Sequence, residues 1–328
     1  MRIFKWMVLT GLALVLSACS KTDTSRDNAP VGKSDVEIFI AQNIITQDIE
    51  LPRAEAVAVR AGKIIGVGSR KELQKRFKNA RLNEEFKSKT IVPGLIDPHI
   101  HMILGAMMYA KPFAPPWDVD TPSGVVKGLP DRTSFLARLS EINTEFSGTE
   151  PLVIYGYHNL VHGALDKHDL DEITTDRPLI IWHYSGHDFY LNSAALDYVG
   201  VDASWAKDFI GVPLGADGEP TGRVYEDAIF RFLTKAGALF LAPQDIERGF
   251  NGFEDMLVRS GVTTVAEMGY GLFGLKLEDQ YYKAFLDADA KTHVYLVPEH
   301  RAFDRGFGDG RIAEINKRVE ASAQTWPR

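Results

Sequence analysis

The sequence predicts an α/β protein, and two observations carry that prediction. After residue 101, short apolar runs alternate with amphipathic segments, which is typical of βα units built around a parallel sheet. Before residue 91, short β-type runs follow one another closely, with turn residues between them. The chain has 328 residues, 45% of them hydrophobic and 25% charged. It is therefore long enough and apolar enough to bury a large core.

The strand-rich region precedes residue 91. We expect a hairpin turn at Ala61-Gly62, because such pairs suit tight turns, and a short helix capped by Ser69. The expected strands and helix are Val36–Ile40, Ala56–Arg60, Lys63–Val67 and Arg70–Phe77.

Buried strands and amphipathic helices are expected after residue 101. The segment Met102–Pro130, rich in Met, Pro and Phe, predicts a long irregular loop instead. The expected strands are Leu152–Tyr157, Leu179–His183, Thr263–Glu267 and Val294–Pro298, and the expected helices are Thr133–Phe146, Glu226–Leu239 and Gln244–Arg259.

The first residues have the pattern of a bacterial lipoprotein signal. Arg2 and Lys5 precede an apolar run, Met7 to Leu16, that is too short to span a bilayer. The run ends in a sequence that resembles a lipobox, with cleavage before Cys19 and lipidation of its thiol. The alternative is a cytoplasmic protein with an apolar start.

These features predict a signal peptide at residues 1–18 and a polar tether at residues 19–35. The protein would then be lipid-anchored on the periplasmic side of a bacterial membrane. Ser20 favours the outer membrane, because the aspartate associated with inner-membrane retention is missing after Cys19.

Charge and cysteine content exclude several classes of function. Cys19 is the only cysteine, so the mature chain has no disulfide and no cysteine metal ligand. Signal cleavage would lower the net charge from −7 to −9 by removing Arg2 and Lys5. An acidic chain without a basic cluster argues against nucleic-acid binding. We expect membrane contact through the lipid anchor only, and the sequence leaves the oligomeric state open.

Two histidines end the apolar segment Ile91–His101. Side chains at i and i+2 of a strand share a face, so His99 and His101 can aim at one point. Two neutral imidazoles converging from a strand end suit a divalent metal, zinc first among them. Asp97, on the same face, could orient a ligand or approach the metal. The alternative is a strand end with two solvated imidazoles.

Four further residues are candidates for the site. His187 follows a predicted strand and is interpreted as substrate-facing, with loop packing as the alternative. Asn192 begins the next helix and is a second substrate-binding candidate. Glu267 ends a strand and could be a ligand or base, or cap a helix. His300 follows the last predicted strand and is an additional ligand candidate, although its charged neighbours favour a solvated turn.

Four segments resemble the amidohydrolase superfamily, and most closely amidohydrolase family 3, the N-substituted formamide deformylase-like group. They occur in the family's order, cover most of residues 36–300, and are Val36–His101, Ser185–Leu196, Asp217–Gly222 and Gly261–Gly269. The resemblance implies an incomplete TIM-type (β/α) barrel of the metal-dependent hydrolase type at residues 91–328. It also implies the N-terminal part of a small β-sandwich at residues 36–90.

The resemblance further implies a metal-dependent hydrolase in which metal-activated water attacks the carbonyl carbon of a small-molecule amide and breaks its carbon–nitrogen bond, which is not a peptide bond. The family carries a later lysine-bearing strand, two histidine-bearing strands and an aspartate proton shuttle, which have no counterpart before Arg328. We therefore expect a C-terminally truncated member whose catalytic residue is unknown. The alternative is an inactive remnant or a ligand-binding lipoprotein. Pocket loops select the substrate, so the metal motif does not name it.

Overall fold

A computed structural model describes residues 35–323. The chain divides into two compact units, Met1–Pro93 and Gly94–Arg328. The predicted signal peptide, the Cys19 lipidation site and the tether up to residue 34 lie outside the described residues. In the described part of the chain, no helix combines the length and the apolar character needed to cross a membrane.

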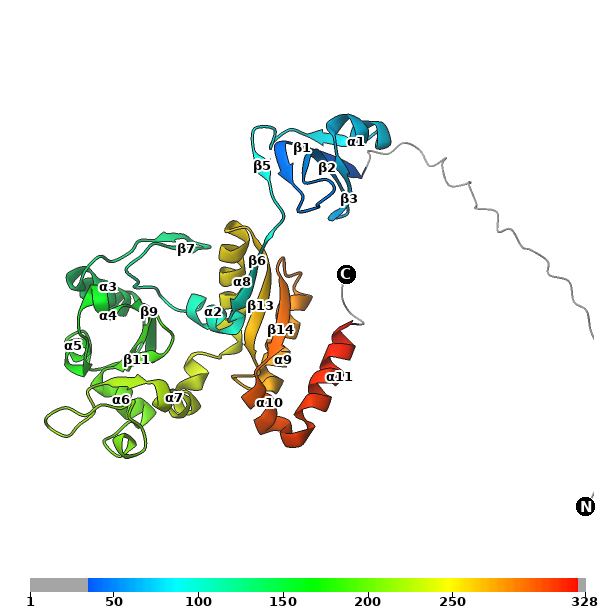
Figure 1. Ribbon diagram of the computed structural model, residues 1–328. Coiled ribbons are helices and arrows are strands. Elements are labelled where there is room, and N and C mark those ends of the chain that lie inside the picture. The colour runs from blue at the N-terminus through cyan, green and yellow to red at the C-terminus, as the bar shows by residue number, and fades with distance from the viewer. Residues whose placement is uncertain (1–34, 324–328) are drawn as a thin grey trace, which may run out of the picture. The chain divides into compact units, whose positions relative to one another are not determined.

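The first unit is a small sheet with one helix. The strand order is β3-β2-β1-β4, and β5 also pairs with β1. Ala61 and Gly62 both have positive φ, 48° and 74°, as the predicted tight turn between β2 and β3 requires. Ser69 and Glu72 form a capping box at the start of α1, which confirms the predicted cap. The elements are β1 Val36–Ile45, β2 Arg53–Arg60, β3 Lys63–Gly68, α1 Arg70–Arg76, β4 Arg81–Asn83 and β5 Thr90–Ile91 (Figure 1).

In the second unit, one sheet is fully parallel and has the order β14-β13-β6. Parallel strands place their carboxyl ends at one edge, and Ile100, which ends β6, pairs with Glu267 of β13. Its strands are β6 Leu95–Ile100, β13 Val262–Tyr270 and β14 His293–Pro298. The accompanying helices are α8 Pro243–Arg259, α9 Leu275–Asp287, α10 His300–Phe307 and α11 Arg311–Ala323 (Figure 1).

A second sheet in this unit has the order β12-β11-β10-β9. Only β9 and β10 are parallel in it, whereas β11 and β12 are antiparallel additions. Its strands are β9 Leu152–Tyr157, β10 Leu179–His183, β11 Asp188–Leu191 and β12 Arg223–Tyr225. Its helices are α3 Arg132–Glu145, α4 Asn159–His162, α5 Lys167–Asp171, α6 Ser193–Val199 and α7 Ile229–Ala236, with 3-10 turns at Trp205–Lys207, Glu226–Ala228 and Gly237–Leu239.

The expectation of one continuous parallel sheet is therefore wrong. The predicted strands at Leu152–Tyr157 and Leu179–His183 exist with those bounds, but they belong to a different sheet from β13 and β14. Alternation of apolar runs with amphipathic helices identifies βα units without specifying which strands pair. That choice depends on contacts between residues far apart in the sequence.

The segment expected to be irregular, Met102–Pro130, begins with the helix α2 Met102–Tyr109 and contains the hairpin β7 Val119–Thr121 and β8 Gly124–Val126. The prolines that suggested a loop begin only at Pro112, after a run of good helix formers. Helix α2 packs closely on α8. The two helices are so close that a Cβ at Gly249 would lie 1.8 Å from the backbone oxygen of Ala106.

A single apolar core connects the two sheets of the second unit. It contains Trp182 of β10, Phe189 of β11, Phe250 of α8 and Val265 of β13, all buried. A separate cluster, centred on Phe135 of α3, covers β9 and β10. The shared core fixes the distance between the two sheets, and the pocket described below is lined from both.

Candidate active site

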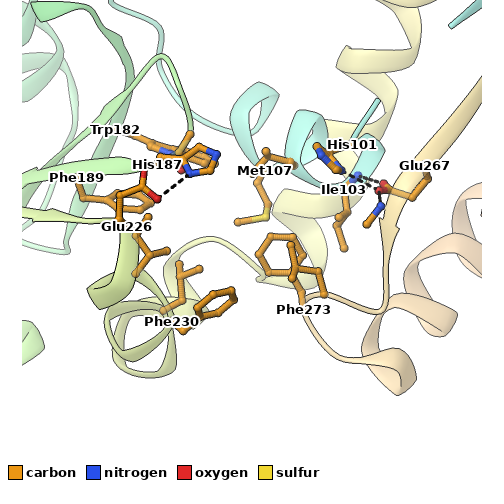
Figure 2. Close-up of a pocket in the computed structure, with 16 residues that line it drawn as sticks. His101, Ile103, Met107, Trp182, His187, Phe189, Glu226, Phe230, Glu267 and Phe273 are labelled. Carbon is orange, nitrogen blue, oxygen red and sulfur yellow. Dashed lines mark hydrogen bonds and ion pairs between the residues drawn. The ribbon is translucent and has the colours of Figure 1, made fainter. Parts of the chain in front are cut away.

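His101 and Glu267 meet where β6 ends and β13 continues. His101 is the N-cap residue of α2, immediately after β6, and Glu267 pairs in register with Ile100. Nδ1 of His101 lies 3.2 Å from Oε1 of Glu267 (Figure 2). The structure thus brings together two residues that are 166 positions apart and that the sequence had marked separately as candidates.

The carboxylate of Glu267 is completely buried and surrounded by hydrogen-bond donors. Besides His101, the backbone N–H of Gly269 donates to it at 2.7 Å, that of Ile103 at 3.3 Å and the hydroxyl of Tyr282 at 2.6 Å. Four donors account for the lone-pair positions of a carboxylate. Glu267 is therefore arranged to hold His101 in place.

The electrostatics of the pair follow from these contacts. Burial alone would raise the pKa of Glu267, but the hydrogen bonds from His101, Tyr282 and the backbone outweigh burial and hold that pKa below its usual value. The hydrogen bond to Glu267 raises the pKa of His101, against the opposite effect of partial burial. Both shifts favour the charged forms, as expected of a carboxylate and an imidazole that stabilise each other.

His99 and Asp97 lie near this pair but make different contacts. The rings of His99 and His101 are 5.7 Å apart between centroids and nearly perpendicular. The carboxylate of Asp97 accepts the backbone N–H of His99 at 3.1 Å. Asp97 therefore shapes the backbone that presents His99.

A cavity of about 290 Å³ opens beside His101 and Glu267. At its other end, Nδ1 of His187 lies 3.6 Å from Oε2 of Glu226, and both side chains are exposed (Figure 2). Glu226 has a positive φ of 46°, which is uncommon for a residue with a side chain. Aromatic and aliphatic side chains make up most of the wall between the two polar pairs, including Met107, Trp182, Phe189, Phe230 and Phe273.

Two predicted site residues are corrected by the structure. Asn192 is fully buried and caps α6, accepting the backbone N–H groups of Ala195 and Leu179 and donating to two carbonyls, so it has no free group for a substrate. His300 lies at the start of α10, is exposed, and accepts a hydrogen bond from Arg311 at 3.2 Å. His300 does not line the cavity beside His101. The charged neighbours correctly indicated a solvated side chain, but His300 begins a helix instead of lying in a turn.

Sequence reasoning missed Tyr282 and Gly269. Tyr282 lies in the middle of α9, where its side chain is indistinguishable in sequence from any other buried aromatic residue. At Gly269, a Cβ would lie 3.0 Å from Nδ1 of His101 and 3.3 Å from the Glu267 carboxylate. The available signal was its position two residues after Glu267 at a strand end.

The donor types present suit a divalent metal. Among residues 35–323, however, no group of three or more His, Cys, Asp or Glu side chains is close enough to hold one. An imidazole whose Nδ1 faces a carboxylate keeps Nε2 for a metal, which is a common arrangement around metal-bound histidines. His99 and His101 offer two imidazoles here, and Glu267 contacts Nδ1 of His101.

His101 and Glu267 thus lie together on adjacent parallel strands, beside a mostly apolar pocket. Residues 87–324 match the model of the amidohydrolase family, so the chain belongs to that family. A solved structure of an uncharacterized metal-dependent hydrolase from Pyrococcus furiosus shares the fold, with a TM-score of 0.57 and 16% identity over 82% of this chain and 51% of that one.

Two curated relatives are similar in sequence. Protein LONG AFTER FAR-RED 3 of Arabidopsis thaliana is 28% identical over 230 residues, which cover 69% of this chain and 37% of that protein. N-substituted formamide deformylase of Arthrobacter pascens is 28% identical over 192 residues, which cover 58% of this chain and 34% of that protein. The chain thus spans about a third of the length of these relatives. The family match thus shows membership of the amidohydrolase family, and the solved structure shows a shared fold.

Proposed function

We propose that this chain carries part of the active site of a metal-dependent hydrolase that cleaves carbon–nitrogen bonds other than peptide bonds. The observation that carries the proposal is the His101–Glu267 pair, which joins the end of β6 to the adjacent parallel strand β13 beside a cavity. Its family membership and the name of the Arthrobacter relative support an amide-type small molecule as substrate.

In this proposal, His99 and His101 bind the metal, for which zinc is the first expectation. Such a metal lowers the pKa of bound water and polarises a carbonyl, which are the two requirements for amide hydrolysis. Glu267 keeps Nδ1 of His101 engaged so that Nε2 faces away from the carboxylate. Tyr282 and the backbone N–H of Gly269 in turn fix Glu267.

Two finer proposals concern architecture and location. We propose that β6, β13 and β14 are strands of a (β/α) barrel of the metal-dependent hydrolase type, and that residues 36–90 belong to a small β-sandwich. The parallel pairing of the three strands supports the first proposal. We also propose attachment to the periplasmic side of a bacterial membrane through Cys19, which the lipobox-like sequence supports.

Elemental analysis of the purified chain tests the metal site. The double variant His99→Ala/His101→Ala should lose most of the bound metal. His300→Ala is the matched control, because His300 is an exposed histidine outside the cavity, and its variant should keep the wild-type metal content. Equal metal content in the wild-type protein and the double variant would contradict the proposal.

A second candidate function is a ligand-binding protein without catalysis. The observation that favours it is the missing third ligand among residues 35–323, together with the apolar cavity. Chromatographic detection of benzylamine released from N-benzylformamide separates the two functions. Release that stops after treatment with a chelator and returns with zinc favours the hydrolase. Binding of the amide without release favours the ligand-binding protein.

A further inference from the structure

His101 lines two pockets. The first, beside Glu267, contains Trp182 and is called here the Trp182 pocket. The second, of about 380 Å³, contains His99 and Trp117 and is called the Trp117 pocket. Only His101 and Leu104 line both, so the histidine that belongs to the candidate metal site borders each pocket.

Apart from His99 and His101, the Trp117 pocket is lined by aromatic rings and other apolar groups. The hydroxyl of Tyr109 donates to the backbone oxygen of Asp120 at 3.2 Å, and that of Tyr155 donates to the backbone oxygen of Tyr184 at 3.0 Å. Both hydroxyls are therefore engaged elsewhere. The pocket wall consists largely of rings, from Tyr109, Phe113, Trp117, Tyr155 and Phe253.

Two rings, one from the lining of each pocket, pack against each other. Tyr155, which lines the Trp117 pocket, and Trp182, which lines the other, pack edge to face with centroids 5.5 Å apart. Trp182 is buried in the shared core. A ligand with one group in each pocket would lie across His101, which borders both.

Each pocket also carries an exposed aromatic ring. Trp117 is 42% exposed and Phe230, in the Trp182 pocket, is 62% exposed. Each volume lies near the lower limit for small-molecule sites, which suits one ring-sized group and not an extended chain. An apolar ligand group would remove these rings from water and be stabilised by that burial.

We propose, building on the hydrolase function proposed above, that the substrate is a secondary amide with an apolar, ring-sized group on each side of its carbon–nitrogen bond. A secondary amide prefers the trans form and extends its two substituents in opposite directions. With the amide at His101, one substituent enters the Trp182 pocket and the other enters the Trp117 pocket. A substrate that has an apolar group on just one side of the amide would fill one pocket and leave the other empty.

Equilibrium dialysis with three probes tests this inference. The probes are N-benzylformamide, 2-phenylacetamide and N-benzyl-2-phenylacetamide, which carry rings on the amine side, the acyl side and both sides. The last probe should bind about tenfold or more tightly than either of the others. Equal affinity of the two-sided probe and the better one-sided probe would overturn the inference.

Variants at the exposed rings assign the pockets. Trp117→Ala and Phe230→Ala should each remove most of the advantage of the two-sided probe. Each one-sided probe should respond to one of these variants and not to the other. Ile210→Ala is the control, because Ile210 is 85% exposed, apolar and outside both pockets. Loss of affinity in the control, or no loss in either pocket variant, would overturn the inference.

Benzylamine measured in the same dialysis samples separates this inference from the proposed function. The binding pattern without amine release supports two pockets and counts against hydrolysis. Amine release without preference for the two-sided probe supports hydrolysis and overturns the two-pocket substrate.

Discussion

Nδ1 of His101 lies 3.2 Å from the carboxylate of Glu267, and this contact joins the end of β6 to β13. His101 also begins α2, the helix that packs on α8. The pair therefore links the candidate site to the helix packing around it. Changes that disturb Glu267 should affect both stability and the position of His101.

Tyr282→Phe should destabilise the protein. The substitution removes one of the donors to a buried carboxylate and leaves an oxygen of Glu267 without that partner. We expect a loss of about 1–3 kcal/mol in the free energy of unfolding, measured by urea denaturation. Tyr198→Phe is the control, since Tyr198 is an exposed tyrosine on α6. Equal losses in the two variants would show that the Glu267 contact contributes nothing.

Gly249→Ala should also destabilise the protein, because its Cβ would lie 1.8 Å from the backbone oxygen of Ala106. Separating α2 from α8 should cost about 1–3 kcal/mol or more. Gly237→Ala is the matched control, with a helical φ of −56° and open space around the new Cβ. It should leave the melting temperature unchanged or slightly higher. If Gly249→Ala and Gly237→Ala have the same melting temperature, α2 and α8 do not pack as closely as described.

Stability should fall with rising pH because of Glu278. Burial raises the pKa of this carboxyl to about 7 from its usual value of 4.5, although two backbone N–H groups donate to it. The folded protein therefore binds a proton that the unfolded chain has lost between these pH values, so this contribution to stability decreases from pH 4.5 to about 7.

Comparison with the variant Glu278→Gln isolates this effect. All other titrating groups are present in both proteins, so their contributions cancel in the difference. The free energy of unfolding of the wild-type protein, relative to the variant, should drop on the order of 1–3 kcal/mol between pH 4.5 and 7. Urea denaturation at several pH values measures it. A constant difference across that range would refute the pKa shift.

The sequence predicts that Cys19 anchors the protein. Wild-type protein expressed in a Gram-negative bacterium should fractionate with membranes and carry diacylglycerol on Cys19, as detected by mass spectrometry of the N-terminal peptide. Cys19→Ser should release the protein into the soluble periplasmic fraction or leave the signal uncleaved. Purely soluble wild-type protein would rule out the anchor.

Local elements were largely predictable. Leu152–Tyr157 and Leu179–His183 have the predicted bounds, because buried parallel strands are short continuous apolar runs. His101, Glu267 and His187 were candidates from sequence, and the structure places all three around one pocket. A histidine or carboxylate that follows an apolar strand is visible in sequence.

Long-range arrangement was not predictable from the same patterns. Strand pairing placed β9 and β10 outside the sheet of β13, and the buried Tyr282 reaches Glu267 from a helix 15 residues later. Asn192 precedes a helix, a position that fits either a substrate-binding residue or a helix cap. In the structure it is the cap. Partners that satisfy a polar side chain become known only with the fold.

Zinc-edge anomalous diffraction tests the central claim most directly. Crystals of the protein grown with zinc should show their strongest anomalous peak bonded to the imidazoles of His99 and His101, at about 2.0–2.1 Å from nitrogen. Crystals of Glu267→Gln should show a weaker peak there, since His101 loses the carboxylate that orients it. A strongest peak elsewhere, with none at His99 or His101, would contradict the account.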